Sequence, residues 1–108
     1  MFSFLNDMGN YEDRKVDFTQ IGDLSVSTAR VSDGEKPYET AVKHPEYHDS
    51  FIIVEAYDTK GEALKGHFLW LERMTNSPLP ETLVDCRNCK LARLLPPDEL
   101  TYHRVDRS

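Results

Sequence analysis

The sequence predicts an α+β fold, with a small antiparallel sheet of about four strands packed on one main amphipathic helix. Three observations support this prediction. Apolar and β-branched residues alternate with polar ones in residues 14–57, turn-forming residues divide that region into short runs, and the hydrophobic period changes after Tyr57. A chain of 108 residues has room for one core. We expect one domain over residues 14–95, a flexible segment at 1–13 and a flexible tail at 96–108.

A β-hairpin is expected at the start of this domain. Val16 and Phe18 occupy alternate positions in the run from Arg14 to Ile21. The turn-forming pair Gly22-Asp23 follows, and residues 24–31 are then rich in β-branched side chains. The pattern therefore indicates two antiparallel strands joined by a tight turn.

Two further strands are expected before the helix. Residues 38–42 form an extended segment that stops at Pro45, and residues 51–57 form the most apolar run of the chain. We therefore expect the second run to be a central strand. Strict alternation would place Phe51, Ile53 and Tyr57 on one side of it, and Ile52, Val54 and Ala56 on the other.

A helix is expected to begin after Asp58. Thr59 followed by Glu62 forms a capping box. Steps of about 100° per residue gather the apolar side chains on one arc, which consists of Trp70, Ala63, Met74, His67, Leu71, Leu64 and Phe68. The same spacing places Leu69 among charged residues, so we expect its side chain to be exposed. Residues 76–80 end the helix, and residues 81–95 could hold a turn, an edge strand or a second helix.

The charge of the chain favours a protein partner. There are 13 Lys and Arg residues against 19 Asp and Glu residues, which gives a formal charge of −6. A negative molecule repels phosphate backbones and anionic lipids, so we expect neither nucleic acid nor a membrane as a partner. The sequence shows no secretion signal and no apolar run of spanning length, which predicts a location in a bacterial cytosol.

Few residues offer chemistry. Cys86 and Cys89 have the spacing of half a zinc site or of a redox pair, but the sequence lacks a second pair of ligands, so we expect no metal and no cofactor. The loop from His44 to Asp49 has the residue types for acid–base catalysis without a nucleophile motif around it, and a solvated loop is the simpler interpretation. We interpret His67 as a core histidine that bonds a backbone carbonyl.

Several segments of the chain resemble a group of small uncharacterised proteins encoded by bacteriophages and prophages. These segments are residues 37–45, residues 53–60, the pair Gly66-His67 with Trp70 and Met74, and Leu79-Pro80 with Asp85. The resemblance covers most of the chain and implies a phage setting without an activity. Phe68 and Leu69 depart from it, because polar residues are typical there.

The order of three strands and then a helix, entered through residues 57–59, also looks like plant AP2-type domains and the amino-terminal DNA-binding domains of integrases. This likeness implies contact with DNA through basic residues on the sheet. Here Arg30, Lys36 and Lys43 are interspersed with acidic residues, which disfavours that function.

The function expected from the sequence is that of a non-enzymatic, phage-derived protein that binds a host or phage protein in the infected cell. The expected partner-binding residues are Phe51, Ile53, Tyr57 and Leu69, because a single helix covers only one sheet face. One alternative is a structural component of the virion or a homo-oligomer, in which that face contacts another copy. A DNA-binding module is the second alternative.

Overall fold

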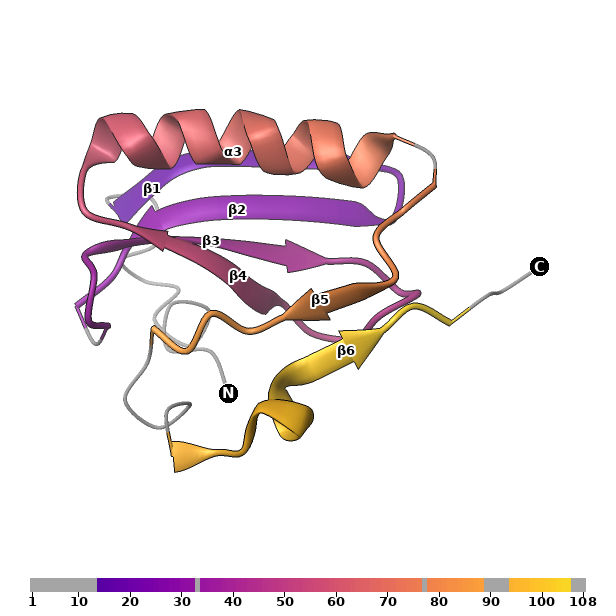
Figure 1. The fold of residues 1–108 in the computed structure, drawn as a ribbon. Coiled ribbons are helices and arrows are strands. Elements are labelled where there is room, and N and C mark those ends of the chain that lie inside the picture. The colour runs from indigo at the N-terminus through magenta and orange to yellow at the C-terminus, as the bar shows by residue number, and fades with distance from the viewer. Residues whose placement is uncertain (1–13, 33, 77, 89–93, 106–108) are drawn as a thin grey trace.

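The structure is a computed structural model that describes residues 14–32, 34–76, 78–88 and 94–105. The predicted flexible segment at 1–13 lies outside the described residues. Within them, the predicted α+β fold is confirmed: a four-stranded antiparallel sheet packs against one long helix (Figure 1).

The main sheet consists of four consecutive strands. They are β1 (Lys15–Ile21), β2 (Leu24–Arg30), β3 (Tyr38–Lys43) and β4 (Ile52–Tyr57), and they lie side by side in the order of the chain. Gly22 has a φ of 58° in the turn between β1 and β2, a conformation that glycine adopts without steric cost. The expectation that residues 51–57 form a central strand was wrong, because β2 and β3 occupy the centre of the sheet.

Strand β4 contains a β-bulge that changes which side chains share a face. Ala41 of β3 pairs with Ile53, whereas the preceding Thr40 pairs with Glu55, so Val54 is an extra residue in β4. A bulge shifts the alternation of side chains by one position. Tyr57 therefore faces the helix, as does Ile52, while Ile53 faces the opposite side of the sheet. The predicted grouping of Phe51, Ile53 and Tyr57 on one face was wrong for this reason.

Helix α3 (Lys60–Thr75) lies across one face of the sheet (Figure 1). The predicted cap is present, since the Oγ1 atom of Thr59 accepts a hydrogen bond of 3.1 Å from the backbone N–H of Glu62. The backbone of Asn76 is extended and ends the helix. Among the described residues there is no helix with the length and apolar character needed to cross a membrane.

The main core lies between the sheet and the helix. Its buried members come from five strand and helix elements and one loop: Leu24, Val26, Val42, Tyr47, Ile52, Val54, Met74 and Leu83. Trp70, Leu71 and Tyr102 pack against this cluster. A smaller cluster, on the other face of the sheet, contains Val31, Ala41 and Ile53 with Phe51 beside them. Both faces of the central strands are therefore buried.

The end of the chain belongs to the fold. Strand β5 (Thr82–Val84) pairs antiparallel with β6 (Thr101–His103), which follows the short 3-10 helix η3 (Pro97–Leu100). The backbone N–H of Cys86 donates to the carbonyl of Ile53 at 2.8 Å, which places this second sheet beside the edge of β4. Leu100 is buried. The predicted domain boundary at residue 95 was therefore wrong, because residues 97–103 pair and pack with the domain.

Candidate functional site

The outer surface of helix α3 carries large apolar side chains. Phe68 is 61% exposed and Leu69 is 60% exposed, and Leu64 lies one turn before Phe68 with an exposed fraction of 36%. The exposure of Leu69 confirms its predicted position. Phe68 was predicted to lie on the apolar arc that packs on the sheet, and its exposure shows that this was wrong. The sheet covers a narrower part of the helix than that arc.

The hydrogen bonds of the helix show which way these side chains point. The Nε1 atom of Trp70 donates to Glu55 of β4 at 2.8 Å, whereas the Nε2 atom of His67 lies 3.1 Å from the Oγ1 atom of Thr19 in β1. Around the helix axis, the order from the β4 side to the β1 side is Trp70, His67, Leu64 and then Phe68. These two side chains therefore project on the β1 side of the helix.

Strand β1 is an edge strand, and no described strand pairs with its outer side. Ile21 pairs with Leu24, whose side chain belongs to the core under the helix, so Ile21 faces the helix side of the sheet. Its side chain is exposed. Ile21, Leu64 and Phe68 thus lie on the β1 side of the domain, and we call these three residues with the outer edge of β1 the β1-side surface.

The residues predicted to bind a partner do not form one surface. Ile53 and Tyr57 are each only 7% exposed and lie on opposite faces of the sheet, while Phe51 is half-buried against Ile53. Tyr57 is held under the helix, where its hydroxyl donates to Thr40 at 3.0 Å. Only Leu69 is open to solvent. Ile21, Leu64 and Phe68 are exposed apolar residues that the predicted set did not include.

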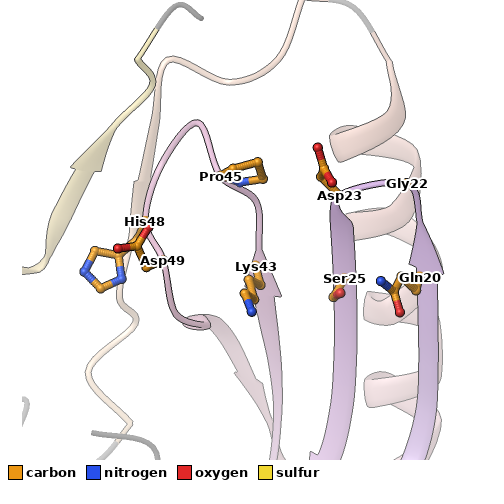
Figure 2. A pocket seen from close by; sticks show the side chains of 8 residues that line it. All are labelled: Gln20, Gly22, Asp23, Ser25, Lys43, Pro45, His48 and Asp49. Carbon is orange, nitrogen blue, oxygen red and sulfur yellow. The ribbon is translucent and has the colours of Figure 1, made fainter.

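A polar hollow of about 280 Å³ lies at one end of the sheet, between the β1–β2 turn and the β3–β4 loop (Figure 2). Gln20, Ser25 and Lys43 line it from three neighbouring strands. His48 and Asp49 line it from the loop that the sequence offered for acid–base chemistry.

The two histidines of this loop have local structural partners. The Nδ1 atom of His48 accepts from the backbone N–H of Ser50 at 3.1 Å, and the Nδ1 atom of His44 accepts from the N–H of Glu46 at 3.1 Å. Both bonds close short turns. The side chains of the hollow supply isolated hydrogen-bonding groups, and the described residues show no nucleophile bonded to either imidazole.

Cys86 is a free thiol at the surface of the domain. The protein around its sulfur desolvates the thiolate and raises the pKa of Cys86 to about 12, although part of the residue is exposed. The thiolate is the form that binds metals and attacks disulfides. Its partner in the predicted motif, Cys89, lies outside the described residues. The described parts of the chain contain no cluster of three potential metal ligands, and the absence of a metal stays a prediction.

His67 is fully buried, and it is satisfied by side chains rather than by a backbone carbonyl. Its Nδ1 atom lies 2.7 Å from the Oγ1 atom of Thr28, which in turn lies 2.6 Å from that of Thr40. Burial lowers the pKa of His67, opposed in part by the carboxylate of Asp17. The imidazole is therefore neutral at pH 7 and serves as a structural link between helix and sheet.

The basic residues considered for DNA binding do not share a face. Arg30 pairs with Tyr38 on the helix side, whereas Lys43 pairs with Ser25 on the other side of the sheet. Among the described residues, Arg30 and Lys43 therefore point away from opposite faces of the sheet.

Comparisons of the chain with family models, with curated proteins and with solved structures found no match.

Proposed function

We propose that this protein is a non-enzymatic binding protein that contacts another protein through the β1-side surface. The observation that carries the proposal is the 61% exposure of Phe68 next to an edge strand without a described partner. An edge strand offers a row of backbone donors and acceptors, and an added strand from a partner satisfies them. Phe68 then supplies an apolar anchor beside the new strand.

The energetics favour Phe68 as the main anchor. Complete burial of a phenylalanine side chain contributes about 1.5–3 kcal/mol, and a few such residues dominate the affinity of most interfaces. Leu64 and Ile21 lie on the same side of the domain and extend the apolar area. The formal charge of −6 disfavours polyanionic partners and supports a protein partner. The resemblance to small phage proteins supports a partner from the infected bacterium.

The experiment compares two substitutions of equal charge on one helix. Phe68→Glu alters the β1-side surface. Leu69→Glu alters a residue of almost equal exposure, and Lys65 and Glu72 separate it from Phe68 around the helix. The tagged wild-type protein and both variants are used to capture partners from a bacterial lysate, with quantitative mass spectrometry. We expect one partner to be retained by wild type and Leu69→Glu and lost from Phe68→Glu.

Equal retention by both variants, or a loss with Leu69→Glu alone, would show that the β1-side surface is not the binding site. Both side chains are exposed, so both variants should melt within a few degrees of the wild-type protein. The melting temperature is therefore the control for folding.

Self-association is a second candidate function, favoured by the sequence of β1. Antiparallel pairing of two copies centred on Phe18 would place Lys15 opposite Ile21 and Asp17 opposite Thr19, so no like charges would oppose each other. Light scattering measures the mass directly. A dimer that becomes a monomer in Phe68→Glu would favour this candidate over a heterologous partner.

A further inference from the structure

The backbone of β1 alternates between groups that face β2 and groups that face away from it. A two-residue turn is closed by hydrogen bonding between the residues on either side of it, which here are Ile21 and Leu24. Bonded and non-bonded pairs alternate along an antiparallel ladder, so the backbone groups of Thr19 also face β2. Those of Phe18 and Gln20 face away. Near its middle, β1 therefore directs the N–H and C=O of Phe18 toward its outer edge.

The backbone N–H of Phe18 has a contact within the single chain. It donates to the Oδ1 atom of Asp17 at 2.8 Å, which agrees with an N–H that points away from β2. The carboxylate of Asp17 thus occupies the place that a carbonyl of an added strand takes. A strand that pairs with β1 at this point must displace that carboxylate.

A twofold axis at Phe18 would give β1 a complete partner in a second copy of the chain. Opposed residues of antiparallel strands share a face, so the axis between two identical strands passes through a residue. Phe18 is the middle residue of the seven in β1, so this axis pairs the whole strand. An axis at Asp17 would instead oppose two carboxylates. The side chain of Phe18 is 41% exposed, and the two copies of it would form a cross-strand aromatic pair.

The same axis would bring the helix side chains of the β1-side surface together. The Nε2 atom of His67 lies 3.1 Å from the Oγ1 atom of Thr19 and 3.9 Å from the Oδ2 atom of Asp17. These two residues flank Phe18, so His67 lies over the middle of β1. Phe68 follows His67 and projects on the β1 side of the helix. The two copies of Phe68 would therefore approach each other across the axis.

Leu64 and Ile21 would complete this contact. Helix α3 runs in the same direction as β1, so Leu64, one turn before Phe68, lies toward the start of the strand (Figure 1). Pairing around Phe18 places the partner's Ile21 opposite Lys15, at that same end. Because the interface is symmetric, the contact between these two exposed apolar side chains would occur twice.

We propose that the β1-side surface is the twofold interface of a homodimer, in which β1 of one copy pairs antiparallel with β1 of the other around Phe18. The N–H of Phe18 exchanges the carboxylate of Asp17 for the carbonyl of the partner's Phe18. This inference rests on the proposed use of the β1-side surface for protein contact and names a second copy as its occupant. A second copy is favoured because one axis relates both the strand pairing and the exposed side chains of α3.

The first test is sedimentation equilibrium of the full chain over a range of concentrations. We expect a monomer–dimer equilibrium, which Phe68→Glu should weaken at least about tenfold, because it replaces a central apolar contact by two carboxylates. Leu69→Glu adds the same charge and should change the dissociation constant less than about twofold. A chain that is monomeric at every concentration, or equal weakening by both variants, would overturn the inference.

Asp17→Ala tests the contact that the partner strand displaces. It should strengthen dimerisation about fivefold, since the N–H of Phe18 no longer has to leave a hydrogen bond within its own chain. Asp23→Ala removes the same charge from the exposed turn after β1 and should change the dissociation constant less than about twofold. Equal strengthening by both variants, or none by Asp17→Ala, would contradict pairing at Phe18.

The outcomes distinguish this inference from the proposed function. A monomer that captures a bacterial protein in a manner that depends on Phe68 would overturn the homodimer and leave the β1-side surface as the binding site. A monomer without any partner that depends on Phe68 would overturn both.

Discussion

The Nδ1 atom of His67 lies 2.7 Å from the Oγ1 atom of Thr28, and this contact joins helix α3 to strand β2 inside the core. Thr28 also contacts Thr40 at 2.6 Å, and Thr40 accepts from the hydroxyl of Tyr57 at 3.0 Å. A line of four side chains therefore crosses the interface between helix and sheet. Each member is buried, so each depends on its neighbours for hydrogen bonds.

Thr28→Val should destabilise the domain by about 1–3 kcal/mol, because it leaves polar atoms of His67 and Thr40 buried without their partner. Thr28→Ser is the matched control, since it keeps the hydroxyl and removes one methyl group at a cost of about 1 kcal/mol. Urea unfolding measures both. A valine variant as stable as the wild-type protein would show that the hydrogen bonds contribute nothing net.

The stability of the domain should fall when the pH decreases below about 6.5, the ordinary pKa of histidine. Burial lowers the pKa of His67 in the folded state, so the unfolded chain binds a proton more readily than the folded chain does. The stabilisation is complete above that pH and is lost as the pH falls toward the lowered pKa. The measurement is urea unfolding at several pH values between 7.5 and 5.5.

Two variants assign that pH dependence. In His67→Leu, the free energy of unfolding should depend less on pH, because the contribution of His67 is gone. This variant should also be less stable than the wild-type protein at every pH. His48→Gln alters an exposed histidine and should retain that contribution. An identical slope in His67→Leu and in the wild-type protein would contradict the assignment.

Gly66→Ala should destabilise the domain although alanine is the better helix former. A Cβ atom on Gly66 would overlap the ring and hydroxyl of Tyr57, and relief of such overlap costs about 1–3 kcal/mol. Gly61→Ala on the same helix meets no atom within 4 Å and should instead stabilise by about 0.5–1 kcal/mol. The melting temperatures of the two variants should therefore shift in opposite directions from that of the wild-type protein. A shift of both in the same direction would argue against close packing of Tyr57 on Gly66.

Removal of residues 96–108 should destabilise the domain by several kcal/mol, because it removes β6 and the buried side chain of Leu100. Leu100→Ala tests the side chain alone and should cost about 2–5 kcal/mol. A chain that ends at residue 105 keeps both features and is the control. If the shorter chain unfolds at the same denaturant concentration as the control, residues 97–103 are not a stabilising part of the fold.

The candidate surface was predicted only in part. Helical spacing correctly placed Leu69 outside the apolar arc, since Lys65 and Arg73 flank it on the helix surface. The same spacing placed Phe68 inside, because periodicity gives the angle of a side chain and says nothing about the width of the sheet below it.

Local interactions determined the elements that the sequence predicted by itself: the turn at Gly22, the first four strands and the helix that begins after the capping residue Thr59. The sequence signal for each of these elements lies within a few residues, although the strands pair over longer separations, such as Ser25 with Lys43. Tertiary structure decided the features that depend on distant partners. The bulge at Val54 turns Tyr57 toward the helix, where Thr40 binds its hydroxyl, and β6 forms because residues 82–84 offer it a paired strand. Burial of Tyr57 and Leu100 stabilises these arrangements, and no local pattern predicts a partner so far away in the chain.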